Sequence, residues 1–282
     1  MVSKSLLPEP QDDGLLHYEV GGWAETKHSL VGLYDRLFST GMKNKWDCRV
    51  YIELYAGPGL LRIRGTNRFI WGSPIHALGI PDAFDKYIFC DSNAGALEAL
   101  QKRVSGRFPG ANASFIAGSC DEKIEEICKE IPGFSTKFRV LSFCFVDPND
   151  ISIKFSTVKK LSQHFVDFLF LLALDMDANR ARQAYLDPSN TKIAEFLGNP
   201  KWRRQWEQST TKDFRRFLAE EYAKQMATLD YIPLEFERMK HVRADDNNRP
   251  LYHLALFSKH KLAYKYWDEV LKYSNPQRSF WD

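Results

Sequence analysis

The chain has 282 residues, which is enough for one large domain or two small ones with a sizeable buried core. Hydrophobic residues make up 44% of it and charged residues 27%, which excludes a disordered, collagen-like or low-complexity chain. Thirty-nine basic against 36 acidic side chains give a net charge of +3. This surplus is too small to indicate a nucleic-acid or membrane partner by itself.

The five cysteines form an odd set without a CxxC pair, so the sequence predicts neither a disulfide framework nor a metal site. The N-terminus, MVSKSLLPEPQDDG, has no apolar signal core, and no run reaches the roughly 18 apolar residues of a membrane span. Reduced thiols and the absence of such segments lead us to expect a cytoplasmic protein with no membrane partner.

In chain order, the proline-rich and acidic residues 1–17 predict a flexible N-terminal arm. From Trp23 to Phe38 the apolar residues recur at helical spacing, which predicts an amphipathic helix ending near Gly41. Five apolar runs then alternate with helix-like stretches, at residues 49–55, 86–90, 113–117, 138–146 and 166–174. This alternation predicts a parallel sheet covered by helices on both faces.

Two later apolar runs, residues 234–242 and 251–258, are separated only by a turn-rich stretch, so they should pair as an antiparallel hairpin. Between the fifth strand and this hairpin, residues 177–228 predict a helical insertion. The sequence therefore predicts one α/β domain over residues 18–282. Its sheet would be Rossmann-like and doubly wound, with five parallel strands and a C-terminal antiparallel hairpin.

Ligands of such sheets bind beyond the carboxyl ends of the strands, so the residues there are the candidates for function. Strand one ends in YIELYAGPG, where Gly57 and Gly59 allow a tight turn close to a ligand and Glu53 adds an acceptor. Strand two ends at Asp91, whose carboxylate could accept both hydroxyls of a ribose. A ligand-free turn and a helix-capping aspartate are the alternatives.

Strand three ends in FIAGSCD, where Gly118 begins a turn and Ser119 or Asp121 either meets a ligand or caps the next helix. Strand four ends in FVDPND, which places Asp147 at the central crevice before Pro148, although this is also a strong turn sequence. A dinucleotide site needs a third glycine where Arg62 stands, so NAD is disfavoured.

The stretch between Gly59 and the next helix is long for a turn. It carries three arginines and is either a lid over the site or a surface loop. Ser73 and Pro74 mark the start of the helix that follows, with Ser73 as its expected N-cap.

YIELYAGPG resembles the first motif, (D/E)xFAGxG, of class I S-adenosylmethionine-dependent methyltransferases. More narrowly, the chain resembles the three-Cys-motif partner family over about residues 23–270, through AGPG, GSP, FVDPND, LALDMDANR and LYHLALFSKHKLAYKYWDEV. The resemblance implies a Rossmann-like fold that binds S-adenosyl-L-methionine and transfers a methyl group to a nucleic acid or another macromolecule. It also leaves open a non-catalytic binding partner of a radical-SAM-like three-Cys-motif protein.

The resemblance also implies roles for the motif residues. Residues 53–59 would hold the methionine end of the cofactor, Asp91 the ribose, residues 118–121 the adenine and Asp147 the transfer centre. The implied cofactor-binding residues are Glu53, Tyr55, Ala56, Gly57, Pro58, Gly59, Asp91, Ser92, Gly118, Ser119, Asp121 and Pro148. Asp147 and Asp150 are the candidate catalytic groups, able to orient the acceptor or take its proton.

For the substrate, the candidates are Lys27, Asn149, Arg203 and Arg204. Lys27 could contact an anionic substrate if the first helix folds over the site, or it could be a solvated helix lysine. Arg203 and Arg204 belong to residues 199–217, which contain six basic and only two acidic side chains. Trp202 and Trp206 lie among them in the sequence. This segment either follows a nucleic-acid backbone or is a helix pair with tryptophans inside and arginines in water.

Overall fold

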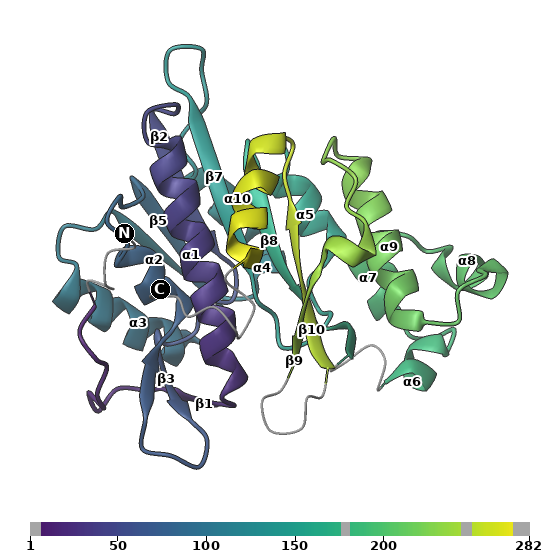
Figure 1. Cartoon of the computed structure of the whole chain (residues 1–282), viewed down its shortest axis with the longest axis horizontal. Coiled ribbons are helices and arrows are strands. Elements are labelled where there is room, and N and C mark those ends of the chain that lie inside the picture. The colour runs from purple at the N-terminus through teal and green to yellow at the C-terminus, as the bar shows by residue number, and fades with distance from the viewer. Residues whose placement is uncertain (1–6, 176–180, 244–249, 273–282) are drawn as a thin grey trace.

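The computed structural model describes residues 7–175, 181–243 and 250–272 (Figure 1). Its centre is a seven-stranded sheet in the order β6-β5-β2-β7-β8-β10-β9. These strands are β2 (Cys48–Glu53), β5 (Lys86–Asp91), β6 (Ala113–Ala117), β7 (Val140–Val146), β8 (Val166–Leu172), β9 (Lys240–Arg243) and β10 (Pro250–Phe257). The first five pair in parallel, and β10 runs antiparallel to both β8 and β9. The predicted α/β architecture with a mostly parallel sheet is confirmed.

Continuous apolar sequence explains why the central strands form where they do. Every residue of β2, β7 and β8 is buried, because helices cover both faces of a parallel sheet. The chain visits β5 and β6 on one side of β2 and then β7 and β8 on the other, so the direction of winding reverses between β2 and β7. A ligand of a doubly wound sheet binds at this switch point, beyond the carboxyl ends of the strands.

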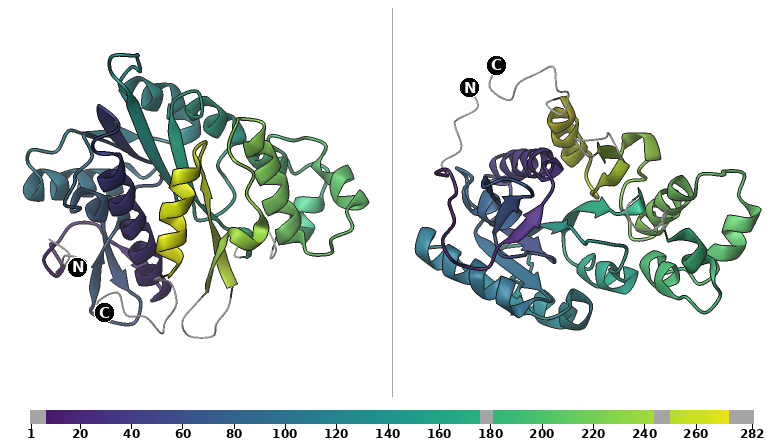
Figure 2. Two further views of the ribbon diagram at one scale, coloured as in Figure 1. Left: turned by 45° about the horizontal axis from the view of Figure 1, so that its top comes forward. Right: turned by 90° about the horizontal axis from the view of Figure 1, so that it is seen from below.

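Helices form a layer on each side of the sheet. α1 and α10 pack side by side on one face, and α2 packs against α1 (Figure 2). On the other face α4 packs on α5, and α7 joins α5 to α9. The helices are α1 (Trp23–Met42), α2 (Ser73–Leu78), α3 (Ala94–Arg107), α4 (Cys120–Glu130), α5 (Phe155–Leu161), α6 (Arg182–Leu186), α7 (Lys192–Leu197), α8 (Trp202–Gln208), α9 (Phe214–Ala227) and α10 (Lys261–Lys272).

The C-terminal hairpin differs from its prediction at its first strand. Residues 234–242 were expected to be extended, but they contain a 3₁₀ turn, η2 (Phe236–Arg238), before the short strand β9 begins at Lys240. Leu234 and Met239 are buried on either side of this turn. Their apolar side chains therefore gave the sequence the pattern of a buried strand, although the backbone between them is not extended. The turn sequence between the two strands lies largely outside the described residues.

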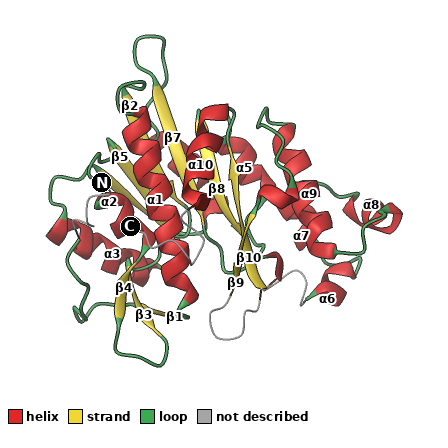
Figure 3. Cartoon of the chain, in the orientation of Figure 1, coloured by secondary structure: helices red, strands yellow, loops and turns green. Residues whose placement is uncertain are grey.

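A second, three-stranded sheet lies beside the start of α1 (Figure 3). It consists of β1 (Tyr18–Val20), β3 (Leu60–Ile63) and β4 (Phe69–Trp71). The arginine-bearing stretch after Gly59, expected to be a lid or a surface loop, is the β3–β4 hairpin of this sheet. Because β1 pairs with β3, the segment before α1 is brought to the glycine turn that follows β2.

The described part of the predicted N-terminal arm contacts the domain. The indole Nε1 of Trp71 donates to the carbonyl of Pro8 at 2.8 Å, and the guanidinium of Arg103 bonds the Asp13 carboxylate. In the described part of the stretch predicted as a helical insertion, residues 181–228, the chain forms the helices α6 to α9. The division of the chain into an arm and one domain stays a prediction. Within the described ranges, no helix is long and apolar enough to cross a membrane.

Candidate functional site

The turn after β2 needs two glycines for different reasons. Gly57 and Gly59 have φ angles of +61° and +78°, a region that side chains with a Cβ rarely adopt. At Gly59 a Cβ would also lie 2.7 Å from Cδ1 of Leu100, whereas at Gly57 the nearest atom, in the ring of Tyr18, is 3.7 Å away. Gly59 therefore allows close packing on α3, and Gly57 leaves room at the sheet edge.

Asp91 joins the ends of β2 and β5 at this edge. Its Oδ2 accepts the Gly57 N–H at 2.7 Å, and its Oδ1 accepts the Asn93 N–H at 2.8 Å. The residue is 9% exposed, and a carboxylate offers about four acceptor positions, so each oxygen keeps capacity for another donor. The neighbouring Ser92 is exposed. Asp91 thus positions the glycine turn and still presents acceptors beyond the strand ends.

Two residues that the sequence did not single out hold this turn in place. The buried guanidinium of Arg103 donates to the carbonyl of Pro58 at 2.5 Å and to that of Leu16 at 2.8 Å. The phenol oxygen of Tyr18 accepts from the side-chain amide of Asn93 at 3.0 Å. Because each contact joins segments that are far apart in the sequence, nothing in the local pattern around Tyr18 or Arg103 could reveal it.

Glu53 is fully buried at the end of β2. Its Oε1 accepts the hydroxyl of Ser73 at 2.5 Å, and its Oε2 accepts that of Tyr51 at 2.9 Å. Burial raises the pKa of this carboxyl well above its usual range, more than these two bonds lower it. The prediction that Ser73 is an N-cap is wrong: the cap of α2 is Gly72, and the Ser73 side chain turns to Glu53 instead.

Lys27 and Asp147 form an ion pair at the switch point. Nζ of Lys27 lies 2.5 Å from Oδ2 of Asp147, and the side chains are 7% and 16% exposed. Lys27 is therefore not a solvated helix lysine. Its ammonium lies 5.3 Å from the ring centre of Trp23, which packs edge-on against Tyr252 of β10. Burial raises the pKa of the Tyr252 phenol, and the negative charge of Asp147 adds to this effect.

Among the predicted adenine-side residues, the polar ones have protein partners. Ser119 caps α4 by accepting the Asp121 N–H at 3.3 Å. Asp121 Oδ1 accepts the Lys154 N–H at 3.2 Å and also bonds the Thr157 hydroxyl, which joins the starts of α4 and α5. Gly118 has a φ of +135°, and its N–H donates to the Asp91 carbonyl. The capping alternative weighed for Ser119 is what the structure shows.

Two other residues at this end of the sheet also face protein groups. Tyr55 is partly buried, and its hydroxyl meets the thiol of Cys120 at 3.6 Å. Asp150 Oδ2 accepts from the ammonium of Lys192 at 2.7 Å. Burial raises the pKa of Asp150, but the Lys192 and Ser152 hydrogen bonds outweigh it and leave that pKa lowered. Asp150 is thus turned toward α7, while Asn149 before it is exposed and Pro148 buried.

Three of the six basic side chains at residues 199–217 bond other protein groups: Arg203, Arg215 and Arg216. The guanidinium of Arg203 donates to four backbone carbonyls at the end of α6, those of Tyr185, Leu186, Asp187 and Asn190. Trp202 is fully buried, and Trp206 packs on Phe214. Arg204 is exposed. The hydrogen bonds of Arg203 give it a structural role, and its contact with a substrate stays a prediction.

A group of ligand-type side chains that the sequence did not predict lies beside β10. Asp175, His241 and His253 offer atoms that all lie within 4.8 Å of one another. The two histidines face each other across β9 and β10, and Asp175 follows β8. The residues are separated by up to 78 positions, so only the strand register brings them together. The group contains no cysteine, so the cysteine pattern of the sequence gives no signal for it.

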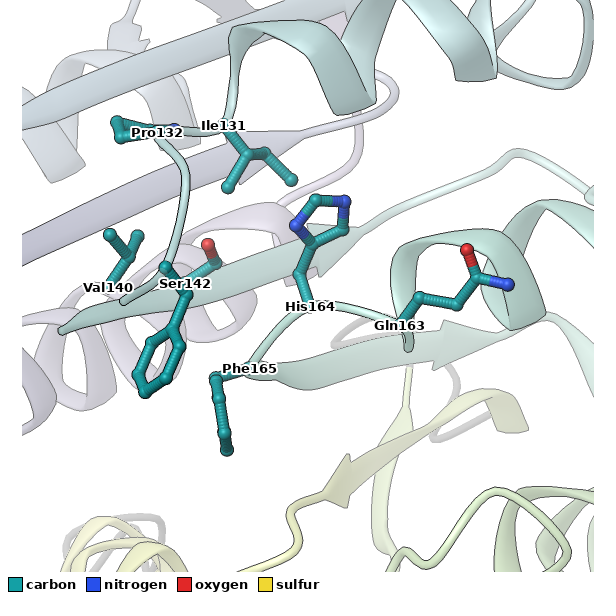
Figure 4. Close-up of a pocket in the computed structure, with 8 residues that line it drawn as sticks. Ile131, Pro132, Val140, Ser142, Gln163, His164 and Phe165 are labelled. Atoms are coloured by element: carbon teal, nitrogen blue, oxygen red, sulfur yellow. The ribbon is translucent and has the colours of Figure 1, made fainter. Parts of the chain in front are cut away.

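A small pocket opens at the opposite edge of the sheet, where β7 and β8 begin (Figure 4). His164 and Phe165 line it from the segment entering β8, and Val140 and Ser142 from β7. Its volume of about 130 Å³ is below the roughly 300 Å³ of typical ligand sites. It also lies away from the carboxyl ends of the strands, so we do not assign the cofactor to it.

No protein-family model matches the chain, and no curated protein matches it in sequence. Among solved structures, it is similar to an O-methyltransferase from Bacillus cereus in complex with SAH, at TM-score 0.48, 10% identity, and coverage of 87% of this chain and 85% of that one. It is also similar to the O-methyltransferase TomG from Streptomyces achromogenes in complex with SAM, at TM-score 0.47, 12% identity, and coverage of 91% and 94%. A third is Trm1 from Pyrococcus horikoshii with S-adenosyl-L-methionine, at TM-score 0.42, 10% identity, and coverage of 87% and 57%. Likeness at this level assigns no residue or reaction to this chain.

Proposed function

We propose that the protein is an S-adenosylmethionine-dependent methyltransferase. The observation that carries the proposal is the convergence of three features at the switch point of the sheet: the glycine turn after β2, the Asp91 carboxylate beside it, and the Lys27–Asp147 pair after β7. This is where a doubly wound sheet binds a nucleotide-like ligand. The missing third glycine weighs against a dinucleotide.

The residues present fit an adenosyl group beside the end of β5. The spare acceptor positions of Asp91 suit the two hydroxyls of a ribose, and the turn at Gly57 lets a ligand approach the backbone without meeting a Cβ. Glu53 has both oxygens bonded to protein hydroxyls, so in our proposal it shapes the turn through Ser73 rather than binding the ligand directly.

Beyond the end of β7, the chain provides positioning groups. Bound S-adenosylmethionine supplies a methyl group activated on a sulfonium, and transfer by in-line displacement depends mainly on how the acceptor is oriented. Lys27 occupies Oδ2 of Asp147, which leaves Oδ1 to accept a hydrogen bond or a proton from an O–H or N–H acceptor. The rings of Trp23 and Tyr252 beside the pair provide an apolar wall for that acceptor.

The proposal is tested by calorimetric titration with S-adenosylhomocysteine, S-adenosylmethionine and NAD. We expect the first two to bind and NAD not to. Asp91→Ala should weaken binding roughly 5- to 150-fold, the equivalent of about 1–3 kcal/mol for a lost charged hydrogen-bond acceptor. Asp82→Ala is the matched control, since Asp82 also accepts two hydrogen bonds, from Thr40 and Lys43, but lies elsewhere.

Absence of binding by the wild-type protein, or equal affinities for Asp91→Ala and wild type, would overturn the cofactor assignment. If the cofactor binds, methyl transfer from labelled S-adenosylmethionine to RNA, DNA and protein fractions identifies the acceptor class. The sequence-based expectation of a nucleic acid or another macromolecule as acceptor is decided by this assay. Transfer that survives in Asp147→Ala at the wild-type rate would remove Asp147 from the transfer centre.

A further inference from the structure

The cluster of Asp175, His241 and His253 lies apart from the Lys27–Asp147 pair. Nε2 of His241 is 3.1 Å and Nδ1 of His253 is 3.6 Å from the same oxygen of Asp175, Oδ2. His241 and His253 are directly paired across the antiparallel strands, with ring centres 4.3 Å apart and planes 10° from parallel. His253 in turn pairs with Leu172 of β8, three residues before Asp175.

These separations are those of atoms that share one metal ion. With zinc–nitrogen and zinc–oxygen distances of about 2.0–2.1 Å, two ligand atoms of a tetrahedral site lie about 3.3 Å apart. The two measured separations from the Asp175 oxygen, 3.1 and 3.6 Å, lie on either side of this value. The ligand atoms of the two histidines lie within 4.8 Å of each other. Because an imidazole lone pair lies in the plane of its ring and the two rings are stacked, at least one ring must rotate about its side-chain bonds to point its nitrogen at the ion.

The second observation is a buried nitrogen without a partner. Nδ1 of His253 makes no hydrogen bond in the part of the chain that the structure describes, although its side chain is only 5% exposed. At 3.6 Å, Asp175 is beyond hydrogen-bond distance from it. A buried polar atom left unpaired costs about 1–3 kcal/mol, and a bound cation would remove this cost.

A hydrogen-bond network holds the carboxylate of the cluster in place. Oδ1 of Asp175 accepts from Arg215 at 2.6 Å, and Arg215 is itself held by Asp213. Two carboxylates thus face one guanidinium. Hydrogen bonds of this kind hold metal-binding carboxylates in orientation.

We propose that Asp175, His241 and His253 bind one divalent transition-metal ion of the zinc class. Two imidazoles and one carboxylate suit Zn²⁺ or Fe²⁺, whereas Ca²⁺ and Mg²⁺ prefer oxygen ligands. The site is independent of the proposed methyltransferase activity, since neither Asp91 nor the Lys27–Asp147 pair belongs to it. The competing explanation is a metal-free hydrogen bond between His241 and Asp175 that only fastens β9 to the sheet.

Cobalt titration distinguishes these explanations. The protein is first treated with a chelator, and Co²⁺ is added while the visible absorption of its d–d bands is recorded, because these bands report coordination geometry. We expect saturation at one equivalent and complete displacement by Zn²⁺. His241→Gln and Asp175→Asn should each weaken binding by about 100-fold or more, and Arg215→Gln by about 10- to 100-fold, as for other outer-shell changes.

His164→Gln is the control, because His164 lies at the opposite edge of the sheet and should leave the cobalt spectrum unchanged. Circular dichroism confirms that each variant is folded; His241, with 26% of its side chain exposed, tolerates substitution better than buried His253. If the wild type takes up no stoichiometric Co²⁺ or Zn²⁺, the proposal is wrong. It is equally wrong if folded His241→Gln binds cobalt as tightly as His164→Gln does.

Discussion

Replacement of Lys27 by methionine tests the energetics of the ion pair at the end of β7. The Lys27 ammonium and the Asp147 carboxylate are 2.5 Å apart, and the two side chains are 7% and 16% exposed. The methionine keeps most of the apolar stem but leaves the mostly buried carboxylate without its counter-charge. Removing one partner of a buried pair costs about 3–5 kcal/mol, whereas exposed pairs contribute about 0.2–1 kcal/mol. We expect Lys27→Met to fall in the first range.

Two further variants separate the buried charge from the general effect of losing a lysine. Lys102→Met removes the partner of Glu98 in a pair whose side chains are 56% and 64% exposed, and it should change the free energy of unfolding by about 0.5 kcal/mol or less. The double variant Lys27→Met/Asp147→Asn also removes the stranded charge. It should regain at least about 1 kcal/mol relative to Lys27→Met, because the two residues are in direct contact.

Urea denaturation followed by circular dichroism measures these differences. With an m-value of up to about 3 kcal/mol/M, a loss of 3 kcal/mol lowers the unfolding midpoint by about 1 M or more. A midpoint for Lys27→Met within about 0.3 M of wild type, or a double variant no more stable than the single one, would refute the idea that this pair is buried and mutually dependent.

Three other perturbations follow from the same structure. Gly59→Ala should lower the free energy of unfolding by about 2 kcal/mol, from strain and overpacking on α3, whereas Gly110→Ala, with open space around it, should change it by less than about 0.5 kcal/mol in the same urea assay. Burial raises the pKa of Asp167 to about 7 from 3.8, so the folded state holds a proton that the unfolded chain has released. Stability therefore falls as the pH rises from about 4 to 7, and urea midpoints across this range should show a flatter slope for Asp167→Asn. Arg203→Ala should cost about 2 kcal/mol in urea because carbonyls lose a charged donor, while Arg204→Ala stays within about 0.5 kcal/mol; equal losses would contradict the structural role of Arg203.

Sequence patterns predicted the large sheet because its central strands are buried on both faces and therefore read as unbroken apolar runs. β6 was predicted at 113–117 and lies at those residues, and β5 extends its prediction by one residue, Asp91. The small sheet was missed for the opposite reason. Its strands have only three or four residues, too few for a periodicity to be recognised, and β3 includes the charged Arg62.

Of the candidate site, only the residues that stand directly at the carboxyl ends of strands could be predicted from the sequence. Asp91 and Asp147 each follow an apolar run, so topology alone places them at one edge. The burial of Lys27 depends on α1 lying across that edge, 120 residues from Asp147 in sequence. The contacts of Arg203 could not be predicted from composition, because a basic and aromatic segment has the same sequence pattern whether its arginines face solvent or bond backbone carbonyls.

β10 connects the two polar sites that the fold creates. Tyr252 and His253 are consecutive on this strand and therefore point to opposite faces of the sheet. Tyr252 packs against Trp23 beside the Lys27–Asp147 pair, whereas His253 stacks on His241 beside Asp175. A substitution at His253 can thus displace Tyr252 through the shared backbone without any metal being involved. Loss of methyl transfer in a His253 variant therefore says nothing about a metal, and the metal site has to be judged on cobalt binding by His241 and Asp175 variants.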